Sequence, residues 1–192
     1  QLDITNKEYK KSIAKIGDIP QTLCLVKNTS VLENVLIGAL PRLNNLKSFF
    51  KMFPKEEIEK AHDILDLVGL DAKSERKVHM LSGGEKRRVA IARALMQTPD
   101  VLLADEIVSE LDSVTAREVM DIIKDAQKKF KLTAIMIHHD MNLALEYANR
   151  VAVIQDGDKV LEIGVEGEQI IDFQTGNLTQ EEILEMYNEP QK

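Results

Sequence analysis

Residues 81–106 read LSGGEKRRVAIARALMQTPDVLLADE, and their pattern is the strongest indication of the fold class. It starts with a serine and two glycines, continues as a helical pattern, and ends in an apolar run closed by Asp105 and Glu106. A second long helical pattern over residues 113–129 leads to another apolar run, residues 132–137. Alternating strands and helices imply right-handed crossovers between parallel strands. The pattern predicts an α/β fold whose chemistry lies at the carboxyl ends of its strands.

Both apolar runs, residues 101–104 and 132–137, are expected to be strands buried on both faces, because neither alternates with polar residues. The other expected elements have ordinary start and stop signals. A first strand ends at Pro20, and a hairpin of residues 151–154 and 160–163 turns at Asp156-Gly157. Four helices are expected: residues 31–40, opened by the Ser30–Glu33 capping box; residues 55–68; a helix capped by Asp140 and running to Tyr147; and residues 179–187.

The composition excludes several classes of protein. The 192 residues include 25 Lys and Arg against 32 Asp and Glu, a net charge of −7, which disfavours nucleic-acid binding. No apolar stretch approaches the ~20 residues that cross a bilayer. The single cysteine, Cys24, excludes an internal disulfide and a cysteine-rich metal site. We expect Cys24 to be a buried or half-buried small apolar residue in a protein of the reducing cytosol.

Two motifs carry the first chemical hypothesis. Asp105 and Glu106 project in different directions from a strand end, so one can hold Mg²⁺ through water while the other orients or deprotonates an attacking water. Taken alone, they are better explained as a solvent-exposed strand end, since apolar runs that end in Asp-Glu are common. Ser82, Gly83 and Gly84 precede a helix, where free amides and the helix dipole can bind an anion. Taken alone, they are as well explained as a plain helix cap.

Two further polar residues, His139 and Gln21, are weaker candidates, and each taken alone is better explained without a functional role. His139 follows a strand and can donate to a phosphoryl oxygen or a water. His138 is expected to be structural, because neighbouring strand residues point to opposite faces. The amide of Gln21, just after the first strand, can coordinate Mg²⁺ or position a water. The basic run of residues 86–88 is expected to form surface ion pairs.

Together, the order and spacing of these residues resemble the ATP-binding subunit of ABC transporters. The resemblance covers about residues 1–190 and rests on five motifs: residues 81–95 are similar to the signature motif, residues 102–106 to the Walker B strand, residues 109–112 to the D-loop, His139-Asp140 to the switch histidine, and residues 16–21 to the Q-loop. A finer resemblance, in residues 35–40, 49–57, 143–148 and 178–187, is to the phosphonate-importer branch.

The resemblance implies a P-loop NTPase-like, mostly parallel sheet with a helical subdomain. It divides the chain into residues 1–30 (core with Q-loop), 31–80 (helical subdomain) and 81–192 (core with the remaining motifs). The resemblance also implies the site residues. Asp105 and Gln21 hold Mg²⁺, Glu106 activates water, and His139 contacts the γ-phosphate of ATP. The segment that faces an ATP on the opposite subunit contains Ser82, Gly83, Gly84 and Glu85, and Asp112 communicates across the dimer.

The implied function is ATP hydrolysis that powers an importer for a phosphonate-like solute. The implied partners are a second identical subunit, a membrane permease that contacts residues 31–80 and the Q-loop, and indirectly a solute-binding protein, with no nucleic acid. The implied location is peripheral, on the cytoplasmic face of the cell membrane.

The chain departs from the family pattern in one large respect. None of its nine glycines opens a Gly-x-x-x-x-Gly-Lys-[Ser/Thr] phosphate loop. We therefore expect a fragment truncated at the N-terminus, inactive as an ATPase on its own. Smaller departures are Ile107-Val108 where Pro-Thr is usual, Glu110 where Ala is common, and Glu85 in place of Gln.

Two alternatives remain open from the sequence. One is a soluble ABC-type ATPase that acts in nucleic-acid repair or translation, although the long coiled-coil insertion of the repair proteins is absent between Gln21 and Leu81. The other is a non-enzymatic interaction module that only dimerises or docks.

Overall fold

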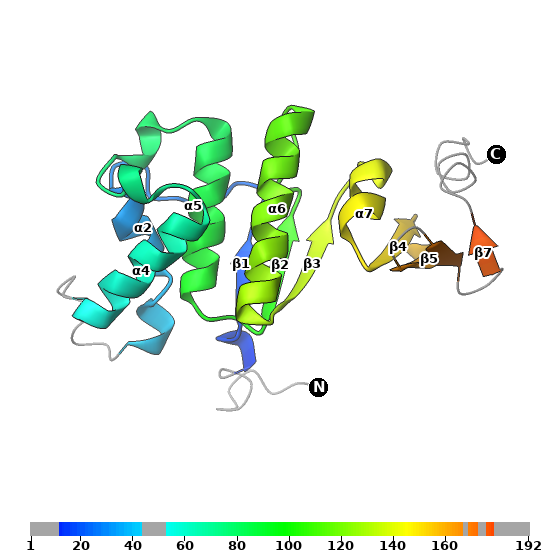
Figure 1. The fold of residues 1–192 in the computed structure, drawn as a ribbon, viewed down its shortest axis with the longest axis horizontal. Helices are drawn as coiled ribbons and strands as arrows, with labels where there is room; N and C mark the ends of the chain where they lie inside the picture. Colours follow the sequence, from blue (N-terminus) through cyan, green and yellow to red (C-terminus); the bar gives the residue numbers. More distant parts are fainter. Residues whose placement is uncertain (1–11, 44–52, 167–168, 173–175, 179–192) are drawn as a thin grey trace. The chain divides into compact units, whose positions relative to one another are not determined.

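The structure, a computed structural model, describes residues 12–43, 53–166, 169–172 and 176–178 (Figure 1). The chain forms two compact units, Gln1–Ile137 and His138–Lys192. The three-part division expected from the sequence rests on the resemblance and stays a prediction.

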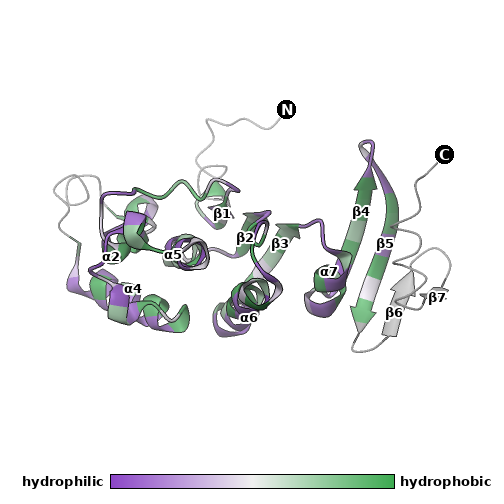
Figure 2. Cartoon of the chain, turned by 90° about the horizontal axis from the view of Figure 1, so that it is seen from above, coloured by the Kyte–Doolittle hydropathy of each residue, from purple (hydrophilic) through white to green (hydrophobic). Residues whose placement is uncertain are grey.

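The first unit is built on a three-stranded parallel sheet in the order β1-β2-β3. β1 spans Ile16–Ile19, β2 spans Val101–Asp105 and β3 spans Thr133–Ile137. Helix α5 (Gly83–Met96) precedes β2, and α6 (Ser113–Phe130) connects β2 to β3. Both helices lie on the same side of the sheet (Figures 1 and 2). The predicted α/β fold with parallel strands is confirmed.

The expectation that these strands are buried on both faces is wrong for the described residues. In β2, Leu102 and Ala104 are buried, whereas Leu103 is only partly covered. In β3, Ile135 and Ile137 are 56% and 59% exposed. The reason is that α5 and α6 cover one face, while no helix or strand of the described part of this unit covers the other (Figure 2). A continuous apolar run in the sequence does not distinguish a strand covered on both faces from a strand covered on one face.

A helical segment lies between β1 and α5. It contains α2 (Val31–Ile37), α4 (Lys55–Leu67) and three short 3₁₀ turns, η1 (Leu40–Arg42), η2 (Asp71–Lys73) and η3 (Val78–Met80). The predicted capping box of α2 is confirmed, because the side chains of Ser30 and Glu33 each accept a hydrogen bond from the other's amide. α2 ends before the expected residue 40, because Pro41 has no amide donor and lies in the first turn of η1 instead.

Asn34 fixes the loop that precedes α2. It is fully buried, and its amide nitrogen donates to the carbonyl oxygens of Val26 and Ser30 at 3.0 Å and to Oγ1 of Thr29 at 2.7 Å. Its oxygen accepts from the Val26 amide at 2.9 Å. A buried amide satisfied in this way holds a loop in one conformation. The chain between β1 and α2 is therefore anchored to the helical segment.

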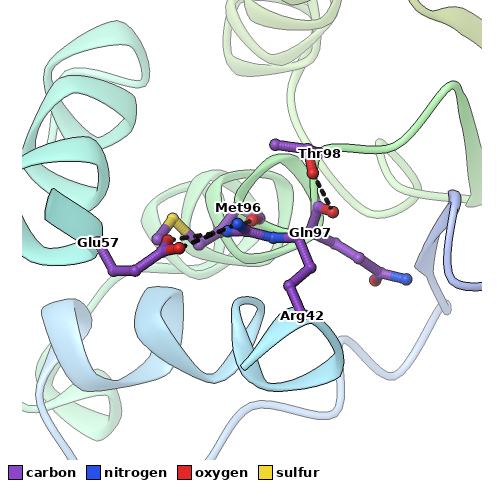
Figure 3. Close-up of polar contacts among 5 residues, drawn as sticks. All are labelled: Arg42, Glu57, Met96, Gln97 and Thr98. Carbon is purple, nitrogen blue, oxygen red and sulfur yellow. Dashed lines mark hydrogen bonds and ion pairs between the residues drawn. The ribbon is translucent and has the colours of Figure 1, made fainter. Parts of the chain in front are cut away.

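Arg42 fastens the helical segment to the end of α5 (Figure 3). Its guanidinium donates to both carboxylate oxygens of Glu57 in α4, at 3.0 and 2.9 Å, and to the carbonyl oxygen of Met96 at 2.8 Å. A bidentate pair has a defined geometry, and a cation at a helix C-terminus is favourable. Residues of η1, α4 and α5 are thus held together, and α5 is fixed at the end opposite Ser82.

The second unit is described by α7 (Met141–Tyr147) and an antiparallel sheet in the order β4-β5-β6-β7. The strands are β4 (Arg150–Gln155), β5 (Asp158–Glu166), β6 (Gln169–Asp172) and β7 (Gly176–Leu178). The hairpin expected at Asp156-Gly157 is confirmed, with positive φ at both residues, and Met141 and Leu145 of α7 pack against Leu161 and Ile163. The helix expected at residues 179–187 lies outside the described residues. Among the described helices, none has the length and apolar character to cross a bilayer.

Candidate functional site

The carboxyl edge of the parallel sheet brings together two predicted site residues. Ile19 at the end of β1 pairs with Ala104 of β2, so Gln21 and Glu106 leave the sheet side by side. The side-chain amide nitrogen of Gln21 donates to Oε2 of Glu106 at 2.7 Å. Residues 85 positions apart in the sequence therefore meet as a positioned carboxylate with an amide donor.

Glu106 is held in a left-handed backbone conformation, with φ of 47°. Its amide donates to the carbonyl oxygen of Ile137 at 3.2 Å, and its carbonyl oxygen accepts from the amide and the hydroxyl of Ser109 at 3.0 and 2.8 Å. A non-glycine residue in this region is uncommon, and such residues cluster at functional sites. The turn after β2 therefore fixes the direction in which the Glu106 carboxylate leaves the strand.

Asp105 is exposed at the last position of β2, in register with Ile137. No group of three or more His, Cys, Asp or Glu side chains suited to a metal occurs in the described part of the chain. The oxygen donors at this edge nevertheless suit Mg²⁺, which binds one or two carboxylates and completes its shell with water and phosphate oxygens. Gln21 contributes its amide nitrogen to Glu106, which leaves its carbonyl oxygen for a cation.

The predicted turn before α5 is a well-formed helix start. Ser82 is the N-cap: its Oγ accepts from the Glu85 amide at 3.2 Å, and its own amide donates to Oε2 of Glu85 at 2.8 Å. This reciprocal arrangement is a capping box. The helix begins at Gly83, and the two glycines lie in its first turn.

The two glycines of this turn differ in what surrounds them. A Cβ at Gly84 would lie 2.7 Å from Cγ2 of Thr115, so close packing against α6 requires a glycine there. A Cβ at Gly83 would meet only the guanidinium of Arg87 at 3.4 Å, and Gly83 is exposed. Packing within the described chain therefore explains Gly84 but leaves Gly83 open to the close approach of a ligand.

Glu85 is ionised by its surroundings. Its pKa is lowered from 4.5 to about 2, first because Lys73 donates to its carboxylate and second because the Ser82 amide does. A lowered folded-state pKa adds stability that is present above pH 4.5 and is lost as the pH falls toward 2.

We expect Glu85→Gln to lower the free energy of unfolding at pH 7 by about 1 kcal/mol, a small value because Lys73 is 41% exposed and water screens the pair. The difference from the wild type should shrink as the pH falls from 4.5 toward 2, as measured by urea unfolding at each pH. A difference that stays constant over this range would contradict the assignment. Lys73→Met should remove most of the same pH dependence, since Lys73 is the larger cause.

The loop after Glu106 is joined to the first turn of α5. Arg87 donates to the carbonyl oxygen of Ser109, within the predicted D-loop. Asp112 is the N-cap of α6 and accepts from the amides of Val114 and Thr115 at 3.1 and 3.0 Å. Hydrogen bonds from the backbone and then the hydroxyl of Thr115 lower the pKa of Asp112. The structure shows a helix-capping role for Asp112, and its role across a dimer stays a prediction.

His138 and His139 are the first two residues of the second unit. Nδ1 of His138 accepts from the amide of Asp140 at 2.8 Å, as a structural histidine would. Asp140 caps α7 as predicted, because its carboxylate accepts from the Leu143 amide at 3.2 Å. His139 is exposed, and its contact with a phosphate stays a prediction.

Arg93 is a residue that the sequence analysis missed. It is half-buried in α5, and its guanidinium donates to the carbonyl oxygens of Leu23 and Cys24 at 2.7 and 2.6 Å. Both of these residues have positive φ, 59° and 44°, a conformation that needs support from outside. Arg93 thus holds the turn just after Gln21. An arginine among the apolar residues of a helix is the signal that could have indicated a hydrogen-bond acceptor for its guanidinium within the fold.

The expectation for Cys24 is wrong, because the residue is exposed. It lies in the loop between β1 and α2, where its carbonyl oxygen accepts from Arg93 and its Sγ lies 3.3 Å from Oγ1 of Thr22. Connecting loops run over the surface, and the position in the loop outweighs the apolar character of a thiol.

Comparisons with known proteins agree with this fold. The profile of the ABC transporter family matches residues 1–109. A phosphonates import ATP-binding protein of Lactococcus lactis is 41% identical over 154 residues, which are 80% of this chain and 63% of that protein. An ATP-binding cassette of an ABC transporter in its ADP conformation superimposes with a TM-score of 0.71 and 29% identity, over 98% of this chain and 70% of that chain. A dimeric cassette bound to ADP and phosphate gives a TM-score of 0.70 and 30% identity, over 87% and 69%.

The chain spans 63%, 60% and 62% of the lengths of three curated relatives that it matches. The family profile nevertheless matches more than half of the chain, over the described part of the helical segment, the turn before α5, and Asp105 with Glu106. This chain belongs to the ABC transporter family, and its similarity is to the ATP-binding proteins of that family.

Proposed function

We propose that this protein is the ATP-binding and ATP-hydrolysing subunit of an ABC importer whose cargo is a phosphonate-like solute. The observation that carries the proposal is the Gln21–Glu106 contact beside Asp105, at the carboxyl edge of a parallel sheet. The similarity to phosphonates import ATP-binding proteins supports the choice of cargo.

In the proposed reaction, Glu106 is the general base for the water that attacks the γ-phosphate of ATP. Its carboxylate takes a proton from the water, and the Gln21 amide holds the carboxylate in place at 2.7 Å. Phosphoryl transfer depends mainly on positioning the reactants and on stabilising charge. A carboxylate held in a fixed position therefore contributes more to the rate than a more basic carboxylate without a fixed position. The left-handed turn at Glu106 supplies that fixed position.

Asp105 and the carbonyl oxygen of Gln21 would hold Mg²⁺. The ion, when bound, neutralises charge on the phosphate oxygens. Asp105 ends β2 and Gln21 lies just after the neighbouring β1, and both side chains offer the hard oxygen ligands that Mg²⁺ prefers.

The turn before α5 would bind the γ-phosphate of an ATP held by a second copy of the subunit. Ser82, Gly83 and Gly84 offer a hydroxyl and backbone amides at the positive end of a helix dipole, with Glu85 completing the cap. The open space at Gly83 supports this role, since packing does not require a glycine there. The structural similarity to a dimeric cassette supports a homodimer, across which Asp112 would communicate. His139, unlike the turn before α5, would contact the γ-phosphate of the ATP bound by its own subunit.

The remaining partners follow from the proposed role. Residues 31–80 and the loop that begins at Gln21 would contact a membrane permease, and a solute-binding protein would act indirectly. The subunit would then lie peripherally on the cytoplasmic face of the membrane. Arg93 and Arg42 support the coupling, because they tie the Gln21 loop and the helical segment to α5.

The test is Mg²⁺-dependent ATP hydrolysis by the complete product of the gene, reconstituted with its permease in lipid vesicles. We expect turnover that rises when the vesicles hold solute-binding protein loaded with a phosphonate, and little turnover from the 192-residue chain alone. Stimulation by an unrelated solute would overturn the choice of cargo. The absence of both ATP binding and hydrolysis in the reconstituted complex would overturn the assignment as an ATPase.

A further inference from the structure

Lys73 and Glu85 form an ion pair that joins the helical segment to the start of α5. The ammonium of Lys73 donates to Oε1 of Glu85, whose side chain is 12% exposed. The other carboxylate oxygen accepts from the Ser82 amide at 2.8 Å. Both oxygens of Glu85 are thus engaged, one by a cation and one by the backbone of the turn.

Lys73 reaches Glu85 from a backbone that is held on two sides. Its amide donates to the carbonyl oxygen of Leu70 at 2.9 Å, and Leu70 is buried. On one side, Nδ1 of His62 in α4 lies 2.6 Å from Oδ1 of Asp71. On the other, the amide of Leu32 in α2 donates to the carbonyl oxygen of Ser74 at 2.9 Å. The turn η2 therefore presents the lysine at a defined place.

The charge of Glu85 matters because of where it lies. Its carboxylate contacts the amide of Ser82, in the turn proposed to face a phosphate. Anion binding at a helix N-terminus depends on positive potential from the free amides and the helix dipole. An uncompensated carboxylate there would repel a phosphate, since like charges at short range cost on the order of 1 kcal/mol even in water.

We infer that Lys73 is a positioning residue of the phosphate-binding turn: it neutralises Glu85 and holds the Glu85 carboxylate against the Ser82 amide, so that Ser82–Gly84 can accept a phosphate. The inference rests on the proposed function, because the phosphate is that of ATP. It adds a residue of the helical segment, Lys73, to a site that the motifs assign to α5 and the strand ends.

The test is a double-mutant cycle on Lys73 and Glu85 in the complete gene product, with kcat and KM for Mg-ATP as the readout. Lys73→Met should raise KM for ATP about 5- to 10-fold, because it leaves the Glu85 charge unopposed. Lys73→Arg, which keeps the charge, should stay within about 2-fold of the wild type. In the Glu85→Gln background, Lys73→Met should change KM by less than about 2-fold, because no charge remains to neutralise.

A wild-type KM in the folded Lys73→Met variant would overturn the inference. It would also fail if Lys73→Met raised KM equally in both backgrounds, since Lys73 would then act independently of Glu85. If Lys73→Met does not fold, Lys73→Gln takes its place in the same cycle, with thermal unfolding as the check. A wild-type protein without Mg-ATP turnover would instead count against the proposed function.

Discussion

Replacing Glu106 with glutamine is expected to lower the kcat for ATP hydrolysis by about 100- to 1,000-fold, because a positioned general base contributes about that much. Glutamine keeps the shape of the side chain and, with its amide oriented to present oxygen, can still accept the hydrogen bond from Gln21. It cannot take a proton from water. Binding of ATP should persist, so the loss should lie in kcat with little change in KM, as steady-state kinetics of the reconstituted complex would show.

The matched control is Glu110→Gln. Glu110 lies four residues further along the same loop and also has a positive φ, of 63°, but it is exposed. The same chemical change there should leave kcat within about 2-fold of the wild type. Turnover by Glu106→Gln at the wild-type rate, or an equal loss in both variants, would show that the general base is a different residue.

Local signals predicted most of the elements. Ser30 and Asp140 were identified as helix caps because their side-chain oxygens stand just before apolar helical patterns, and both caps are present. Asp156-Gly157 predicted a hairpin because its turn needs positive φ at two residues. Each of these signals involves residues within four positions of one another, which a pattern in one sequence can reveal.

Contacts between distant residues could not be read from such patterns. Gln21 and Glu106 were expected in one site only through the resemblance, and the structure brings them together across 85 positions. Arg93 donates to a turn 69 and 70 positions away, and no residue near Arg93 in the sequence indicates that contact. The exposure of Cys24 and of Ile135 also depends on which elements cover them. Pairing and coverage are properties of the packed chain, and a pattern within one sequence does not show them.

Replacing Gly38 with alanine is expected to lower the free energy of unfolding by about 2–3 kcal/mol, the cost of overpacking a close-packed contact. Gly38 caps the end of α2 where it crosses α5. A Cβ there would overlap the carbonyl oxygen of Arg93 and lie 3.0 Å from Cβ of Met96. The first obstacle is main chain, which cannot rotate away, so the helices must separate. Thermal unfolding of the complete protein should show a midpoint about 5–10 °C lower.

Gly83→Ala is the matched variant, because it makes the same change where there is room. The nearest atom to its Cβ would be a guanidinium nitrogen of Arg87 at 3.4 Å, an ordinary van der Waals contact, and alanine favours a helix more than glycine does. Its unfolding midpoint should equal or exceed that of the wild type. Its ATP turnover should nevertheless fall, since a methyl group would then stand where the phosphate approaches. Gly38→Ala should show the opposite pattern. Its unfolding midpoint should fall, but each folded molecule should keep its ATP turnover, because the turn before α5 is intact. Equal stabilities for the two variants would mean that α2 and α5 do not cross as closely as the structure places them.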